Sequence, residues 1–116
     1  MIRFIPYNLN MILKKNNQVI GKIKGNFINN NKYFYMYGLR IIENERGNNY
    51  GLDLINNYEN YILKQSNIKG FRLNCPNFQN DYKLVNYYEK INYKIDNKNE
   101  IYFDDNLVIP MIKKIN

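Results

Sequence analysis

The chain has 116 residues, 45% of them hydrophobic, and its 17 Lys and Arg against 10 Asp and Glu give a net charge of +7. This length indicates a single domain, residues 1–116, which can bury a core without covalent cross-links. A lone cysteine, Cys75, excludes an internal disulfide, and the absence of histidine excludes Cys/His zinc sites and nucleophiles activated by histidine. We therefore expect no metal site.

Three predicted strands occupy the first part of the chain. Met11–Lys15 and Val19–Ile28 are separated by Asn16 and Asn17, a pair that tolerates the positive φ of a tight hairpin turn. Further asparagines lead into the third strand, Lys32–Ile42, which is rich in aromatic and β-branched residues. The pattern predicts an antiparallel meander.

Helical and extended patterns alternate in the rest of the chain. From Tyr50 to about Lys64, apolar residues recur on one helical face, with Glu59 among the polar residues assigned to the other. The elements predicted after this helix are a strand at Ile68–Asn74, a helix at about Asn80–Ile91, and strands at Tyr93–Ile95, Glu100–Phe103 and Leu107–Ile115. This order fits an α+β sheet with one parallel crossover around the first helix.

A polar turn joins the third predicted strand to the first predicted helix. The backbone N–H groups that open a helix have no intrahelical partners, and together with the helix dipole they attract anions. The turn follows Arg46 and contains small residues or residues that tolerate a left-handed backbone, namely Gly47, Asn48, Asn49 and Gly51. This pattern predicts a phosphate-binding turn, and an ordinary strand-to-helix loop is the alternative.

A second motif lies downstream. The stretch NDYKLVNYYEKINYKI, Asn80–Ile95, resembles the fYeklGF signature of the GNAT family of N-acetyltransferases, with Tyr88-Glu89-Lys90 in the YEK positions. The polar turn is then similar to the acyl-CoA turn of that family, R/Q-x-x-G-x-G/A, with Asn49 in the first Gly position and Gly51 in the last. The chain is identified as a short member of this family, and the resemblance runs from about residue 11 to the C-terminus.

The resemblance implies an α+β fold with a mixed, mainly antiparallel sheet of about six to seven strands, a central strand–helix–strand crossover and a second helix. The family normally has two further helices between its first and second strands, and here only Ile2–Leu9 is available before Met11. We therefore expect one side of the sheet to have less helical cover than usual. Either a homodimer or an open acceptor cleft would account for that surface.

The same resemblance implies acetyl-CoA as the cosubstrate. Backbone amides of Ile41 and Ile42, at the end of the third strand, would bind the pantetheine arm and the acetyl carbonyl. The backbone of Arg46–Gly51, which includes Tyr50, would hold the pyrophosphate.

Two positions depart from the family pattern. Asn49 replaces a glycine and must adopt the left-handed conformation for the turn to fit. Asp81 stands where the family commonly has an Asn that binds the pantetheine arm, and Asn80 is the neighbour that could substitute for it. A carboxylate there accepts hydrogen bonds but donates none.

The tyrosine of the YEK motif implies Tyr88 as the catalytic acid, which would give its proton to the departing thiolate. Packing within the apolar helix stripe is the alternative for Tyr88. Tyr87, one residue earlier, points about 100° away on a helix and is expected to be inert. Glu43 and Glu45 follow the third strand and are the candidate general bases, with a water-mediated base as the other option.

The sequence thus predicts an N-acetyltransferase that transfers an acetyl group from acetyl-CoA directly to a primary amine of a protein or a small molecule. A catalytically inactive acyl-CoA-binding relic of the family is one alternative. A small basic nucleic-acid-binding protein is another, because the chain combines its positive charge with 12 Tyr. However, the lysines are spread along the chain, and abundant Asn, Lys, Ile and Tyr without Ala or Thr are typical of an AT-rich genome. Nucleic acid is therefore not an expected partner.

No apolar run approaches the roughly 18 residues of a membrane span, and the N-terminus lacks the long apolar region of a signal peptide. We expect a soluble protein in the cytoplasm or otherwise inside the cell, without a membrane partner.

Overall fold

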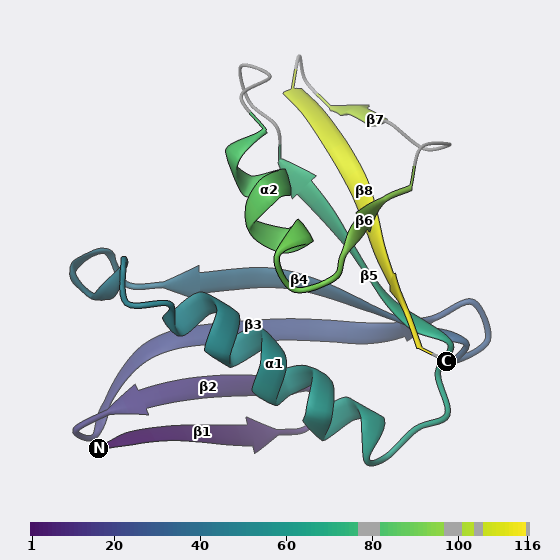
Figure 1. Ribbon diagram of the computed structural model, residues 1–116. Coiled ribbons are helices and arrows are strands. Elements are labelled where there is room, and N and C mark those ends of the chain that lie inside the picture. Colours follow the sequence, from purple (N-terminus) through teal and green to yellow (C-terminus); the bar gives the residue numbers. More distant parts are fainter. Residues whose placement is uncertain (77–81, 97–100, 104–105, 116) are drawn as a thin grey trace.

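One mixed sheet carries two helices on the same face (Figure 1). The computed structural model describes residues 1–76, 82–96, 101–103 and 106–115. The strands are β1 (Ile2–Tyr7), β2 (Asn10–Lys15), β3 (Gln18–Ile28), β4 (Tyr33–Ile41), β5 (Gly70–Pro76), β6 (Lys94–Ile95), β7 (Ile101–Phe103) and β8 (Asn106–Lys114), and the helices are the 3-10 turn η1 (Glu43–Glu45), α1 (Tyr50–Leu63) and α2 (Lys83–Glu89). The order is β1-β2-β3-β4-β5-β8-β6, with β7 paired to β8. Among the described pairs only β4 and β5 are parallel.

Asparagine turns connect the meander of β1 to β4. Asn16 and Asn17 have φ values of 52° and 68° between β2 and β3, as predicted for this hairpin. β1 is a strand that the sequence patterns did not identify, and it pairs antiparallel with β2 along its whole length. Only Asn8 and Leu9 separate β1 from β2, so no helix lies between these two strands.

The core between α1 and the sheet is centred on Phe34 of β4. Its ring packs edge-to-face against Phe27, Tyr58 and Phe71, with centroid distances of 5.0, 5.6 and 6.2 Å. A Cβ atom at Gly25 of β3 would lie 2.2 Å from this ring, so glycine is needed for the close approach. Burying one large apolar side chain of this kind contributes about 1.5–3 kcal/mol to folding.

Glu59 of α1 is buried, which corrects its predicted place on the polar face of the helix. Its side chain accepts a hydrogen bond of 2.6 Å from the Tyr93 hydroxyl. It also forms an ion pair of 2.8 Å with Lys113 Nζ of β8. The residue is only 4% exposed. A buried carboxylate is tolerated because both oxygens are satisfied by these partners. The network fastens α1 to the C-terminal part of the sheet.

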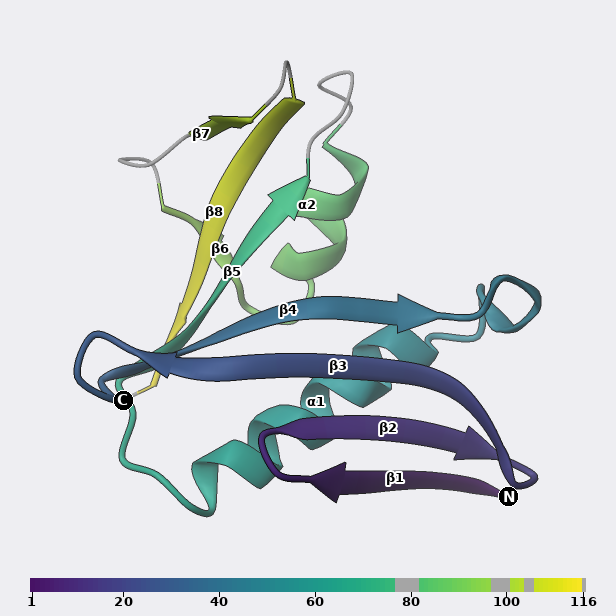
Figure 2. The same cartoon turned by 180° about the vertical axis from the view of Figure 1, so that it is seen from behind.

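β4 and β5 pair only over Tyr33–Tyr35 and Gly70–Arg72, and beyond this point they diverge (Figure 2). α2 lies beside the resulting opening and is shorter than the helix predicted from Asn80 to Ile91. Residues 80 and 81 lie outside the described part of the chain, and residues 90–92 form a turn.

The predicted fold class is confirmed: a mixed, mainly antiparallel sheet with a β4–α1–β5 crossover and a second helix. β1 adds an eighth strand to those expected. The sheet face opposite the helices is bare in Figure 2. Within the described residues, neither helix has the length and apolar character required to cross a membrane.

Candidate active site

A cavity of about 890 Å³ opens beside the first turn of α1, where β4 and β5 diverge. A smaller cavity of about 200 Å³ adjoins it between the two strands. Both cavities are lined by Tyr37, Gly38, Leu39, Pro76 and Tyr88. The larger one is also lined by Lys22, Lys24, Arg40, Ile41, Glu45, Arg46, Gly47, Asn49, Tyr50, Gly51, Leu84 and Tyr87.

The polar turn before α1 borders the larger cavity with the geometry of an anion site. Asn49 precedes the helix in the left-handed conformation, with φ 61° and ψ 18°, which confirms what the turn was expected to require. Its side chain does not cap the helix, so the N–H groups of the first turn face outward from α1. A Cβ atom at Gly47 would meet nothing within 4 Å, which leaves open space for a ligand.

Arg46 is anchored at the end of β4. Its Nε donates a hydrogen bond of 2.9 Å to the Ile41 carbonyl, and its terminal NH₂ groups remain as further donors. The Ile42 amide donates to the Ile20 carbonyl at 2.8 Å, so it is already engaged by β3 and does not serve a ligand. Because N–H groups alternate along an antiparallel ladder, the Ile41 amide points to the other edge of β4, toward the opening.

Tyr88 lies at the junction of the two cavities. Burial, followed by the nearby Cys75 thiol and Tyr87 hydroxyl, raises the pKa of Tyr88 to about 12. The hydroxyl therefore keeps its proton at neutral pH and can donate it. Burial also raises the pKa of Cys75 to about 11, and this thiol is fully buried, so it is not a nucleophile at neutral pH.

Tyr87 also lines the larger cavity, which corrects the expectation that it faces away. A Cβ atom at Gly51 would lie 2.4 Å from the Tyr87 hydroxyl, and the backbone of Leu52 donates a hydrogen bond to the same oxygen. The rings of Tyr87 and Tyr88 meet edge-to-face at 5.5 Å. The two tyrosines do point in different directions, but the larger cavity extends around the side of α2 that carries Tyr87. Tyr87 therefore covers the first turn of α1.

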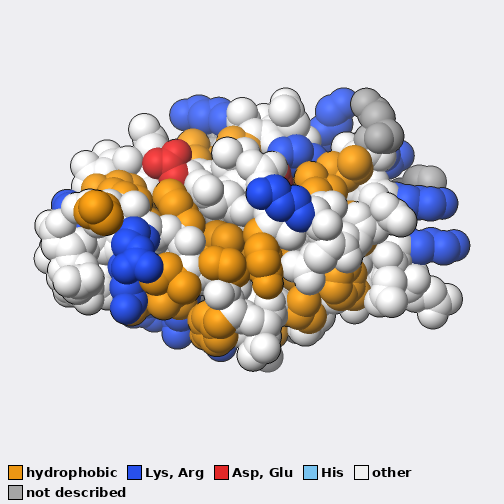
Figure 3. Space-filling model, turned by 90° about the horizontal axis from the view of Figure 1, so that it is seen from below, with side chains coloured by type: hydrophobic (Ala, Val, Ile, Leu, Met, Phe, Trp, Pro, Cys, Tyr) orange, Lys and Arg blue, Asp and Glu red, His pale blue; other side chains and the backbone are white. Residues whose placement is uncertain are grey.

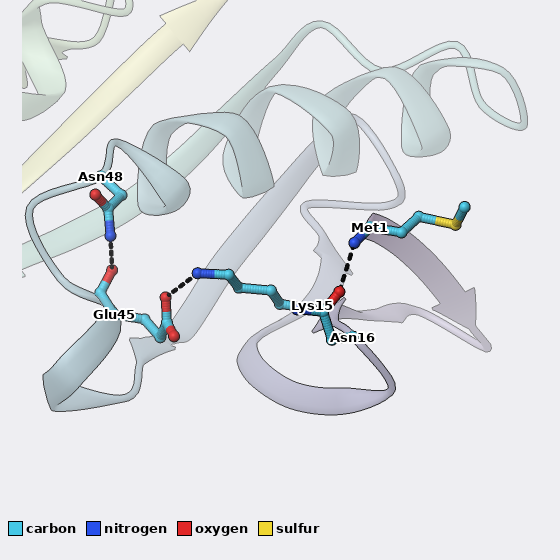
Figure 4. A network of polar contacts seen from close by, with 5 residues as sticks. All are labelled: Met1, Lys15, Asn16, Glu45 and Asn48. Carbon is cyan, nitrogen blue, oxygen red and sulfur yellow. Dashed lines mark hydrogen bonds and ion pairs between the residues drawn. The ribbon is translucent and has the colours of Figure 1, made fainter.

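The two predicted bases occupy different environments. Glu43 is exposed on η1 and is not among the lining residues. Glu45 lines the cavity, but its carboxylate forms an ion pair of 2.9 Å with Lys15 (Figure 4). This carboxylate raises the pKa of Lys15. Asn48 donates to the Glu45 carbonyl at 3.2 Å and braces the turn from outside the cavity.

The cavity brings together eight predicted residues, Ile41, Glu45, Arg46, Gly47, Asn49, Tyr50, Gly51 and Tyr88. Among the predicted residues that the structure describes, those outside its lining are Ile42, Glu43 and Asn48. Asn80 and Asp81 lie outside the described residues. Sequence reasoning missed the cations Lys22, Lys24 and Arg40. Their alternation with apolar residues in β3 and β4 was readable from the sequence, but the bulge that sets the register between the two strands was not.

Comparisons with known proteins agree with this geometry. The family model described as "Acetyltransferase (GNAT) family" matches residues 3–93. No curated protein matches the sequence. Ard1 from Thermoplasma volcanium superposes with a TM-score of 0.78 at 19% identity, over 92% of this chain and 70% of that one.

Two further structures were solved with coenzyme A ligands. An aminoglycoside 6'-N-acetyltransferase complexed with coenzyme A gives a TM-score of 0.76 at 16% identity, over 92% of this chain and 72% of that one. A structure from Bacillus anthracis str. Ames in complex with acetyl coenzyme A gives 0.72 at 21% identity, over 91% of this chain but only 61% of that one. At these identities the likeness establishes the fold.

No metal cluster accompanies the cavity. Within the described part of the chain, no three His, Cys, Asp or Glu side chains come close enough together to hold an ion.

Proposed function

Because the chain belongs to the acetyltransferase (GNAT) family, we propose that it transfers an acetyl group from acetyl-CoA directly to a primary amine, without a covalent enzyme intermediate. The observation that carries this proposal is the position of Tyr88 between the two cavities, with the first turn of α1 bordering the larger one. Since acetyl-CoA is an intracellular metabolite, the proposal includes an intracellular location.

The cosubstrate would bind on the α1 side of the larger cavity. We assign its pyrophosphate to the first turn of α1, where the Asn49 side chain does not cap the helix and Gly51 contributes no side chain. Arg46 would add charge-assisted hydrogen bonds from its terminal nitrogens. The apolar smaller cavity, lined by Ile55 and Leu73 among others, suits the thioester end of the molecule.

In the proposed reaction the amine nitrogen attacks the thioester carbonyl carbon. The Ile41 amide is the candidate donor to the oxygen of the tetrahedral intermediate. As the C–S bond breaks, the sulfur takes the proton of the Tyr88 hydroxyl, and the proton lost by the amine passes to water. Tyr88 is then reprotonated from solvent, a recovery favoured by its raised pKa.

A catalytically inactive acyl-CoA-binding protein is the second candidate. The observation that favours it is the state of the carboxylates, since Glu45 is paired with Lys15 and Glu43 lies outside the cavity lining. Such a protein would bind acetyl-CoA with the same turn but release no thiol.

Thermal unfolding of the full chain with four ligands tests the proposal. We expect acetyl-CoA and coenzyme A to raise the midpoint, since a ligand at a hundred times its Kd adds about 2.7 kcal/mol, whereas ATP and single-stranded DNA should have little effect. Thiol release with a panel of amines then separates the two candidates. Stabilisation by DNA and not by acetyl-CoA would contradict both.

We also propose a homodimer that uses the edge strand β1. Figure 3 shows hydrophobic side chains gathered on the side of the molecule where β1 lies, and Ile2 and Tyr7 of this strand are 37% and 49% exposed. An edge strand with such side chains invites pairing with a second copy. Light scattering at micromolar concentration is expected to give twice the 14.1 kDa chain mass, and Tyr7→Lys should shift it toward the monomer. A wild-type mass of one chain at all concentrations contradicts the dimer.

A further inference from the structure

Basic side chains border the larger cavity on the sheet face that α1 does not cover. The backbone of Gly25 in β3 lies against Tyr58 of α1. Side chains alternate along a strand, so Lys22 and Lys24 project from the opposite face. Arg40 is the cross-strand partner of Lys22 and projects with it. All three cations line the cavity.

Among the described residues, no free carboxylate lies beside these cations in the cavity lining. Within that part of the chain, Glu45 is the single acidic lining residue, and Lys15 already neutralises it at 2.9 Å. The uncovered side of the cavity is therefore positively charged. Arg46 lies with the first turn of α1 and is assigned to the cosubstrate, so it does not account for the other three.

The smaller cavity is lined by residues from both faces of the sheet. Met36 and Ile55 line it from the helix side, and Tyr37 and Asn74 from the uncovered side, with Tyr88 also in its wall. An acceptor that enters from the uncovered face thus reaches Tyr88 without crossing the first turn of α1. In this arrangement the two substrates approach from opposite faces of the sheet.

We propose that the acceptor is the α-amino group of a peptide whose next side chains are acidic. This inference rests on the proposed acetyl transfer. Lys22, Lys24 and Arg40 would attract carboxylates that follow the reacting amine and repel polyamines, aminoglycosides and lysine-rich segments.

The reactivity of the amine points to the same class. An amine attacks a thioester only in its neutral form, and the lining residues that the structure describes offer no unpaired carboxylate to remove a proton. Neighbouring cations lower the pKa of a bound amine. An α-amino group, with an ordinary pKa of about 7.7–8.0, then reacts more readily than a lysine ε-amine at about 10.4.

Four acceptors test the proposal with the full-length chain. They are a peptide with Asp and Glu after a free N-terminal Ser, the same peptide with Lys in place of the acids, an N-terminally blocked acidic peptide with one internal Lys, and spermidine. We expect the first to give a kcat/KM about tenfold above each of the others. The double variant Lys22→Glu/Lys24→Glu should reverse the order of the first two peptides, a ratio of rates that does not depend on how tightly the variant binds coenzyme A.

The matched control is Lys14→Glu/Lys94→Glu, which makes the same change of charge on the same face outside the cavity lining. It should retain the preference for the acidic peptide. Equal or better use of the basic peptide by the wild-type chain, or a preference that survives reversal at Lys22 and Lys24, overturns this proposal alone. Absence of thiol release with every amine, despite binding of acetyl-CoA, overturns the proposed function as well.

Discussion

The meander of β1 to β4 and the segment from β5 to β8 contribute to the site in different ways. The meander leads without interruption through η1 into α1, so the phosphate turn is formed by neighbours in sequence. Tyr87 and Tyr88 belong to the second region, which meets the first through three paired positions of β4 and β5 and through the Glu59 network. The proposed binding turn can thus be built locally, whereas the proposed catalytic arrangement depends on how the two regions dock.

The largest expected effect comes from the second region. Tyr88→Phe removes the proposed proton donor and should lower kcat by about 10²–10⁴-fold, with little change in the affinity for acetyl-CoA. Thiol release under saturating acetyl-CoA measures the loss. Tyr7→Phe, on the exposed edge strand, is the matched control. Equal rates for wild-type and Tyr88→Phe protein would make Tyr88 a packing residue.

Gly51→Glu addresses the first region. The Cβ atom of the new side chain would collide with the Tyr87 hydroxyl, and its carboxylate would place like charge beside the pyrophosphate. We expect the affinity for acetyl-CoA to fall about a hundredfold, with each factor of ten equal to about 1.4 kcal/mol. Calorimetry measures this change, and Asn56→Glu, which adds the same charge at an exposed position of α1 outside both cavity linings, is the control. Unchanged binding by Gly51→Glu would remove the phosphate assignment.

Two ion pairs allow a comparison between the two regions' mutual contact, Glu59–Lys113, and a contact inside the first region, Lys15–Glu45. Glu59→Ala breaks a pair in which the carboxylate is only 5% exposed, and its loss should cost about 3 kcal/mol of unfolding free energy. Lys15→Met breaks the more exposed pair with Glu45, whose side chains are 36% and 17% exposed, and should cost clearly less because solvent screens an exposed pair. Urea titration of both variants checks the order. A larger loss for Lys15→Met would place the critical contact inside the meander.

The smallest effect is expected at Tyr87, where the two regions touch. Its hydroxyl occupies a backbone donor of the first turn of α1, so Tyr87→Phe should free that donor and tighten acetyl-CoA binding about threefold. One hydrogen bond of this kind contributes about 1 kcal/mol net to folding. Calorimetry on Tyr87→Phe tests this, and weaker binding would mean that the hydroxyl helps to hold the cosubstrate.

Local patterns predicted most of the meander. Asn16 and Asn17 indicated their hairpin, and the polar turn indicated both α1 and the left-handed Asn49. β1 was not predicted because a short edge strand is recognisable mainly from the strand with which it pairs. The hairpin turn, the start of α1 and the left-handed Asn49 each depend on at most a few neighbouring residues.

The errors concern contacts between distant residues. Glu59 looked like a surface residue because its partners, Tyr93 and Lys113, follow it by 34 and 54 positions. Tyr87 looked inert because helical periodicity gives directions on α2 but not what α2 faces. The engagement of the Ile42 amide by Ile20 depends on a strand register that a bulge in β3–β4 alters.

The asparagine turns also affect the unfolded chain. Nine non-glycine residues of the described structure have positive φ, and eight of them are asparagines. Glycine would enter this conformation with less strain, but it would also sample far more conformations before folding. Asparagine reaches the same backbone angles and leaves a stiffer disordered chain. The turns therefore limit the entropy that must be lost when the meander forms, which favours early closure of its hairpins.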